Sequence, residues 1–306
     1  SAGNGITAIG AQLKKEVSNR LNYAVDVGVV HASPYLMMDT LYSLGEGEEK
    51  VSGTLKGLSA ETNESLQVCI HNEIGYRKAF FSVFESFVGA FSAANKGDEF
   101  LKTISKMTIN GIPVGFIEEK YALDSDGGIS EKVKESMLLP VDENSMARTD
   151  SGSISSGRSD GTLINATDYL IENSKLISRY SISYKEDKWL LEGELQGKAL
   201  KSTLDHSGSF ISNFGGYQQT SKLMKSDKTA LTFNMWVPKV DPVSGTEVAL
   251  VEVPDNADAN FKLEMGGTSM LFKANKNAIL EHAVLESGAI KMVMETLYAK
   301  GIPKLP

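Results

Sequence analysis

The spacing of hydrophobic and polar positions predicts a helix at the start of the chain. Apolar residues recur at helical spacing over residues 6–21, and charged residues occupy the opposite side. The apolar positions are Ile6, Ile9, Leu13, Val17 and Leu21. After this amphipathic helix we expect a strand over residues 23–30, a short helix over 34–44 and an exposed hairpin arm over 50–58.

A cluster of phenylalanines marks the next expected element, which is either a long helix over residues 66–95 or a short strand followed by a helix. Four phenylalanines recur at i, i+4, i+7 and i+11 and so fall on one stripe; they are Phe80, Phe84, Phe87 and Phe91. No basic segment flanks the stripe, as a membrane-binding helix would require. Because buried aromatic side chains dominate core energetics, we expect the stripe to be core.

Helices and hairpins alternate over the rest of the chain. We expect a helix over residues 98–107, two short strands over 109–123 and a helix over 165–177. Three hairpins follow, with turns at residues 185–188, 241–245 and 266–267. Two helices, over 276–286 and 287–300, are expected to close the chain before Gly301 and Pro303.

These elements predict an α+β fold, in which antiparallel hairpins pack with a long aromatic-rich helix and terminal helices. Residues 141–163 are rich in serine and glycine and predict a polar loop. The loop separates a helix-rich part over residues 1–140, with a hairpin arm and a central helix, from antiparallel hairpins with C-terminal helices over residues 164–306. The alternative is one continuous domain that includes both parts.

Composition and charge narrow the class of protein. The chain has 306 residues, 41% of them hydrophobic and 23% charged, which indicates a folded globular protein. The net charge of −8 repels a phosphate backbone, so we expect no direct sequence-specific binding of nucleic acid. Residues 79–94 form the longest mostly apolar stretch and are too short for a membrane span.

The cysteine content and the first residues suggest where the chain is made. Cys69 is the lone cysteine, so no intrachain disulfide can form, which fits a reducing compartment. The sequence SAGNGITAIG has neither the basic start nor the apolar run of a signal peptide. We therefore expect synthesis in the cytoplasm, with a virion as the final location of a particle protein.

No motif is strong enough to predict a cofactor, and the metal candidates are weak. Asp124, Asp126 and Glu135 occupy positions one, three and twelve of a calcium-binding loop. Ile129 stands where the sharp turn of that loop needs glycine. The alternative is a solvated acidic turn.

Two groups of residues are candidates for catalysis. Cys69 and His71 are two positions apart, so on a strand they would share a face as a thiol–imidazole pair or as part of a zinc site. The alternative is a buried thiol beside a histidine. His206 follows Asp205 and precedes Ser207, and consecutive side chains do not form a triad without distant partners.

With no catalytic constellation, the sequence favours a structural subunit that assembles with copies of itself, and a capsid or tail protein of a virus or phage particle is the expected version. The N-terminal apolar stripe needs a partner groove and the polar loop has little to bury. The expected assembly contacts are Ile9, Leu13, Val17, Ser153, Ile154 and Arg158. The alternatives are an enzyme of an unrecognised family using His206 or Cys69 with His71, and a membrane-inserting or pore-forming protein.

Overall fold

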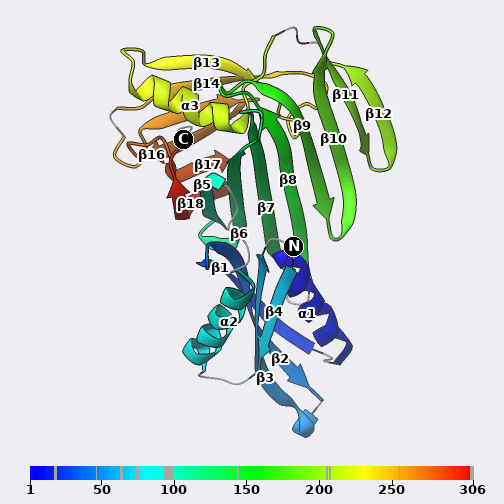
Figure 1. The fold of residues 1–306 in the computed structure, drawn as a ribbon. Helices are drawn as coiled ribbons and strands as arrows, with labels where there is room; N and C mark the ends of the chain where they lie inside the picture. Colours follow the sequence, from blue (N-terminus) through cyan, green and yellow to red (C-terminus); the bar gives the residue numbers. More distant parts are fainter. Residues whose placement is uncertain are drawn as a thin grey trace.

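The chain folds mainly into antiparallel β-sheet (Figure 1). A computed structural model describes residues 1–16, 19–45, 47–62, 65–72, 76–92, 99–142, 145–204, 206, 208–254 and 256–303. Strands make up 62% of the structure and helices 14%, so the expected α+β class is wrong.

The first sheet has four strands in the order β1-β2-β3-β4, each antiparallel to its neighbour. The strands are β1 (Asn19–Val30), β2 (Ser33–Leu44), β3 (Val51–Thr62) and β4 (Ser65–His71), with a short 3-10 helix at Gly47–Glu49. Strand β2 replaces the helix expected over residues 34–44. Both of its faces are buried, so its apolar run does not alternate with polar residues and resembles a buried helix.

Two helices cover opposite faces of this sheet (Figure 1). Helix α1 (Ala2–Glu16) packs Ile6 and Ile9 into one core, and helix α2 (Arg77–Ser92) packs into another. Phe80 and Phe84 of α2 are buried, which confirms the core prediction for these two. Phe87 is 42% exposed, and the side chain of Phe91 lies outside the described part of the structure. The strand-then-helix alternative over residues 66–95 is the one observed.

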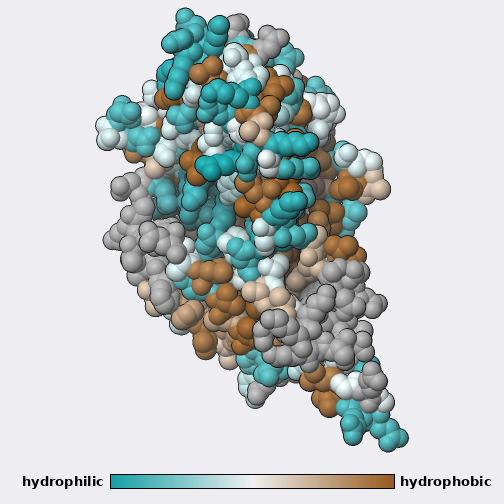
Figure 2. Space-filling view, turned by 90° about the vertical axis from the view of Figure 1, so that its right-hand side faces the viewer, coloured by the Kyte–Doolittle hydropathy of each residue, from teal (hydrophilic) through white to brown (hydrophobic). Residues whose placement is uncertain are grey.

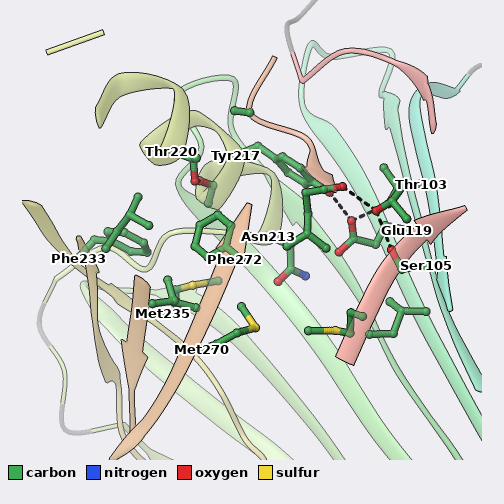
Figure 3. A pocket seen from close by; sticks show the side chains of 18 residues that line it. Thr103, Ser105, Glu119, Asn213, Tyr217, Thr220, Phe233, Met235, Met270 and Phe272 are labelled. Carbon is green, nitrogen blue, oxygen red and sulfur yellow. Dashed lines mark hydrogen bonds between the residues drawn. The ribbon is translucent and has the colours of Figure 1, made fainter. Parts of the chain in front are cut away.

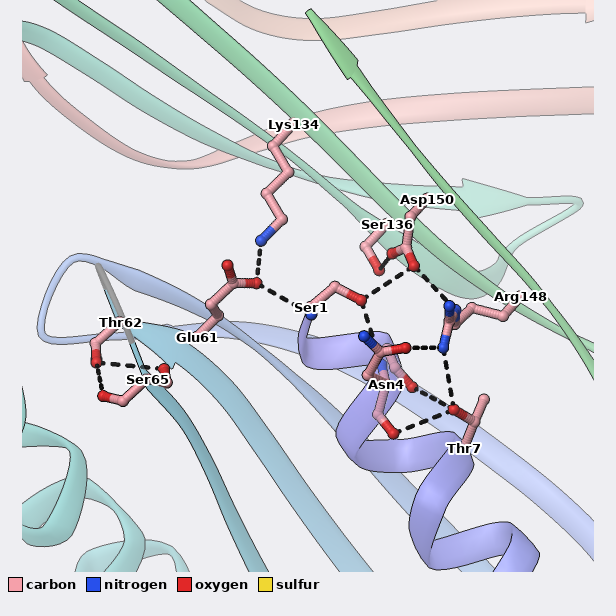
Figure 4. A network of polar contacts seen from close by, with 11 residues as sticks. Ser1, Asn4, Thr7, Glu61, Thr62, Ser65, Lys134, Ser136, Arg148 and Asp150 are labelled. Atoms are coloured by element: carbon pink, nitrogen blue, oxygen red, sulfur yellow. Dashed lines mark hydrogen bonds and ion pairs between the residues drawn. The ribbon is translucent and has the colours of Figure 1, made fainter. Parts of the chain in front are cut away.

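Polar contacts fix the start of α1 against strand β8 (Ser145–Gly157) of the second sheet (Figure 4). Arg148 and Asp150 form a nearly buried ion pair, with 2.9 Å between Nε and Oδ2. Ser1 Oγ donates to Asp150 at 3.0 Å, and Arg148 Nη1 donates to Asn4 Oδ1 and to Thr7 Oγ1. A buried charge pair gains from such additional hydrogen bonds. The first turns of α1 are therefore fixed against strand β8 of the same chain.

Over the described residues, the second sheet has fourteen strands, all antiparallel, in the order β12-β11-β10-β9-β8-β7-β6-β5-β18-β17-β16-β15-β14-β13. The strands are β5 (Glu99–Ile109), β6 (Ile112–Leu123), β7 (Ile129–Asp142), β8 (Ser145–Gly157), β9 (Leu163–Glu172), β10 (Lys175–Lys185), β11 (Lys188–Leu195), β12 (Lys198–Thr203), β13 (Ala230–Met235), β14 (Thr246–Glu252), β15 (Phe261–Met265), β16 (Thr268–Ala274), β17 (Leu280–Ser287) and β18 (Ile290–Gly301). Neighbours in the sheet are neighbours along the chain, except where β18 pairs with β5.

Strand β8 lies where the sequence predicts the polar loop of residues 141–163. Its serines are accommodated because neighbouring strands satisfy the backbone and carboxylates accept from the hydroxyls. Ser155 Oγ donates to Glu131 at 2.9 Å, and Ser151 Oγ donates to Glu135 at 3.0 Å. The sheets thus divide the chain into residues 19–71 and residues 99–301.

The other expected helices in this half are also wrong. Strand β5 replaces the helix over residues 98–107, β9 replaces the helix over 165–177, and β17 and β18 replace the two closing helices. Gly288, with a φ of 60°, makes the turn between β17 and β18 that the sequence interpretation treated as part of a helix. All three expected hairpins are present, as β10–β11, β13–β14 and β15–β16.

A third helix, α3 (Asn213–Met224), lies against one face of the large sheet, where it shares a cavity with strands β5, β6 and β13 to β18 (Figure 1). The segment before α3 connects β9 with β13 at the edge of the sheet, because Leu163 N donates to Phe210 O and Ile211 N donates to Asn234 O, both at 2.8 Å. The sheet therefore curls around α3. Within the described residues, no helix has both the length and the hydropathy needed to cross a membrane.

Candidate ligand-binding cavity

A cavity of about 260 Å³ lies between α3 and the curled sheet (Figure 3). Strands β5, β6 and β13 to β18 supply most of its wall, and α3 and the turn before β17 supply the remainder. Its lining residues are Thr103, Ser105, Ile117, Glu119, Asn213, Gly216, Tyr217, Thr220, Phe233, Met235, Leu250, Leu263, Met270, Phe272, Ala278, Leu280, Met294 and Thr296. A cavity of this kind, mostly apolar with a few polar groups, is typical of small-molecule sites.

The apolar part of the wall comes from strands β13 to β18. Residues two apart on a strand point to the same face, which is how Phe233 and Met235 on β13, and Met270 and Phe272 on β16, both reach the cavity. Met294 contributes from β18. Methionine side chains are flexible and polarisable, so this wall can adapt to ligands of different shape.

The polar part of the wall centres on Glu119 of β6. Thr103 on β5 is the direct cross-strand partner of Glu119, and its Oγ1 donates to Glu119 Oε2 at 2.9 Å. From α3, Tyr217 Oη donates to the same oxygen at 2.5 Å. Figure 3 shows these three side chains pointing toward one another. Helix and sheet are thus joined through one carboxyl group.

Burial raises the pKa of Glu119, and the hydrogen bonds from Tyr217 and Thr103 oppose that rise without cancelling it. Burial and the neighbouring Glu119 carboxyl also raise the pKa of Tyr217 well above its ordinary value. No lysine, arginine or histidine is among the residues that line this cavity in the described structure. An ionised Glu119 would therefore lack a cationic partner.

The position of α3 is set by a second buried carboxyl group. Glu131 on β7 accepts from the backbone N–H groups of Asn213 at 3.1 Å and Phe214 at 3.3 Å. The first N–H groups of a helix have no partner within the helix, and a carboxylate placed there satisfies them and complements the helix dipole. Ser212 caps the same end by accepting from Gly215 N at 3.1 Å. Helix α3 is thereby fixed as one wall of the cavity.

The predicted metal residues lie in two places. Asp124 and Asp126 are in the turn between β6 and β7, where Asp126 Oδ1 accepts from Gly128 N at 3.1 Å. Glu135 lies six residues beyond Ile129 along β7, roughly 20 Å at the rise of a strand. There it accepts from Lys239 Nζ at 2.9 Å. Among the described residues, no three histidine, cysteine or acidic side chains form a possible metal site.

The predicted catalytic candidates are separate from the cavity. Cys69 and His71 do share one face of β4. Cys69 packs against the core between α2 and the sheet, and the ring centroids of His71 and Phe80 are 5.1 Å apart. Burial raises the pKa of Cys69, which disfavours the reactive thiolate. His206 stacks on Phe210 with 4.3 Å between ring centroids, and its buried Nε2 has no hydrogen-bond partner in the described structure. Asp205 and Ser207 lie outside the described residues.

The residues expected to form assembly contacts lie in different elements and differ in burial. Ile9 is buried within the chain, Leu13 lies in α1, and Val17 is outside the described residues. Ser153 and Ile154 lie in β8, with Ile154 53% exposed, and Arg158 lies in the following turn, where its Nη1 donates to Thr162. Figure 2 shows hydrophobic side chains reaching the surface in patches among hydrophilic ones. Self-association stays a prediction.

Sequence reasoning missed Glu119, Thr103, Tyr217 and the helix that carries Tyr217. The sequence predicts no element over residues 213–224, because the adjacent glycines Gly215 and Gly216 disfavour a helix. The available signal is Ser212, a good N-cap residue, followed by polar and apolar residues at helical spacing.

Comparisons with known proteins show similarity of fold and nothing more. No family model and no curated protein sequence matches the chain. Among solved structures, the chain is similar to a β-barrel-like protein of the domain of unknown function DUF1849 from Brucella abortus, with a TM-score of 0.51 and 12% sequence identity. The match covers 65% of this chain and 96% of that protein. Neither the fold nor the comparisons support the expected capsid, tail or virion role.

Proposed function

We propose that this protein is a binding protein for a small, mostly apolar molecule, which occupies the cavity between α3 and the curled sheet. The observation that carries the proposal is the cavity itself, about 260 Å³ in volume and lined by apolar side chains from strands far apart in the chain. Burying apolar ligand surface there would provide most of the binding free energy.

The lining divides into a polar part and an apolar part. Glu119, Tyr217 and Thr103 gather at one part of the wall, while Phe233, Leu250 and Met270 are among the apolar residues of the other part. A molecule with one polar group and an apolar body matches this division.

The test uses N-phenyl-1-naphthylamine, an uncharged dye whose fluorescence rises in apolar surroundings. We expect saturable binding to the wild-type protein. Met270→Trp places a larger side chain in the cavity and should weaken dye binding at least tenfold. Ser269→Trp is the matched control, because Ser269 is the preceding residue of β16, is exposed and points to the opposite face.

A second filling variant, Thr220→Phe, tests the same space from α3. Circular dichroism and thermal melting identify the variants that are folded, and dye binding is compared among those only. Equal dye affinity in the wild type and in a folded filling variant would contradict the proposal, as would the absence of saturable binding to the wild type.

A further inference from the structure

We infer that the ligand carries an uncharged oxygen-containing group, such as a hydroxyl or an ester, which hydrogen-bonds to Glu119 at the polar part of the cavity. The inference rests on the proposed function and adds the chemical class of the ligand. It stands on the contacts of Glu119, on the residues around it and on the charge that the cavity can accept.

An anionic group is disfavoured because nothing in the cavity balances its charge. The described lining residues include one acidic side chain, Glu119, and no basic one. A carboxylate or phosphate that left water for this wall would lose its hydration without gaining an ion pair. It would also lie beside the Glu119 carboxyl group.

The hydrogen bonds from Tyr217 and Thr103 leave one carboxyl oxygen of Glu119 available to the ligand. Tyr217 and Thr103 both donate to Oε2, and neither donor is charged. In a protonated carboxyl group the carbonyl oxygen accepts, so Oε2 takes these two bonds and the hydroxyl is left on Oε1. That hydroxyl is a donor, and its natural partner is an oxygen acceptor on the ligand.

A cationic group would need an ionised Glu119 as its partner. Burial raises the pKa of Glu119, so the ionised carboxyl group is less favourable there than in water, and a ligand ammonium group would also bear its own desolvation. A hydroxyl or an ester has neither cost. This difference makes the uncharged class the expected one.

The groups around Glu119 suit an uncharged partner. Ser105 Oγ and Thr296 Oγ1 lie 3.1 Å apart on neighbouring strands, and both line the cavity. The side-chain amide of Asn213 lines it from α3 (Figure 3). Hydroxyl and amide groups can donate or accept, so they can pair with an alcohol or an ester oxygen.

The experiment compares dodecanol, dodecylamine and dodecanoate as competitors of N-phenyl-1-naphthylamine at pH 7, each below the concentration at which it forms micelles. The three share one chain length and differ in the charge of the polar group. We expect dodecanol to displace the dye at a concentration at least tenfold lower than either charged competitor.

Two variants test the role of Glu119. Glu119→Gln keeps a neutral group with one acceptor and one donor, so dodecanol affinity should stay within about threefold of wild type. Glu119→Leu keeps apolar volume and removes the polar group, so the preference for dodecanol over the charged competitors should shrink at least tenfold while dye binding persists.

The outcomes separate this inference from the proposed function. If dodecylamine is the best competitor in the wild type and this preference is lost in Glu119→Gln, Glu119 binds the ligand in its ionised form. That result would overturn the inference, although the cavity would still be a binding site. Preference for dodecanoate would overturn it equally. A wild-type protein that does not bind the dye would overturn the proposed function, and the inference with it.

Discussion

Phe84 is fully buried between α2 and the four-stranded sheet, where its ring meets Tyr35 edge-on at 5.9 Å between centroids. Phe87, less than one turn further along the helix, is 42% exposed. Two phenylalanines of one predicted stripe thus have different environments. The spacing in the sequence identifies the stripe, but the curvature and extent of the partner sheet decide which members are covered.

Replacing Phe84 with alanine should lower the free energy of unfolding by about 3–5 kcal/mol, the range for truncating a buried aromatic side chain. Phe87→Ala is the matched control from the same helix and should cost less than about 1 kcal/mol. Urea denaturation followed by circular dichroism measures both. Equal losses for the two variants would show that the core does not depend on Phe84 as the structure implies.

Helix α3 depends on close backbone packing at one of its two adjacent glycines. A Cβ atom on Gly215 would lie 2.2 Å from the carbonyl oxygen of Gly161 and 2.6 Å from Ile211 Cγ2. A Cβ atom on the adjacent Gly216 would meet no atom within 4 Å. The two neighbouring glycines therefore differ: only Gly215 is required by the packing of α3 against the turn before β9.

Gly215→Ala should destabilise the protein by about 1–3 kcal/mol, because the turn at Gly161 or the helix must move to make room. Gly216→Ala should be neutral or stabilising by up to about 1 kcal/mol, since alanine favours the helix more than glycine does. Thermal unfolding of the two variants provides the comparison. If Gly216→Ala were destabilising and Gly215→Ala neutral, the structure would have assigned the close contact to the wrong glycine.

Hairpins were easier to predict from the sequence than the elements between them. Gly266-Gly267 and the polar turn around Glu186 mark reversals of the chain locally, and both are observed. The predictions for the segments that form strands β2 and β8 are wrong for opposite reasons. Residues 35–38 are apolar without alternation because both faces of β2 are covered, whereas Ser151 and Ser155 lack apolar bulk and are buried as partners of Glu135 and Glu131. Such partners come from other strands, so a local pattern cannot reveal them.

The candidate cavity could not be predicted for the same reason. Glu119 is one of two consecutive glutamates, and nothing in the sequence separates it from Glu118, which pairs with Lys102 at 2.8 Å. Only the pairing of β5 with β6 and the placement of α3 turn Glu119 toward Thr103 and Tyr217.

For the whole molecule, the inner face of the large sheet gathers acidic groups. Strand register places Glu119, Val133, Ser153 and Asp168 side by side across β6 to β9, on one face. Burial raises the pKa of Asp168 to about 6, with Lys239 opposing the rise and Glu135 adding to it. Below its ordinary pKa of 3.8, Asp168 is protonated in the folded and the unfolded chain alike. Between that pH and about 6, the unfolded chain releases the proton first, so the free energy of unfolding falls as pH rises.

Asp168→Asn should remove this contribution. The variant should match the wild type near pH 3 and exceed its free energy of unfolding by about 1–3 kcal/mol at pH 8, allowing for the partial exposure of Asp168 to water. Urea denaturation at a series of pH values measures the difference. Asp126→Asn, in the exposed turn after β6, is the control and should follow the wild-type curve. A constant difference between Asp168→Asn and wild type across the series would contradict the assigned pKa.

The pairing of β18 with β5 has a consequence for the order of folding. Ser105 and Thr296 are hydrogen-bonded although 191 residues separate them, and β18 is the last described strand along the chain. Strands β5 to β12 can form successive hairpins while the chain is being synthesised, and so can β13 to β17. Strand β18 pairs with β5 and so joins these two groups of strands, but only after β18 itself has been synthesised. Closing so long a loop is entropically costly and slow. Until β18 pairs with β5, each group of strands exposes an unpaired edge strand, and the wall around α3 is incomplete. The nascent chain would therefore depend on this late pairing to avoid association through the exposed edges and to form its cavity.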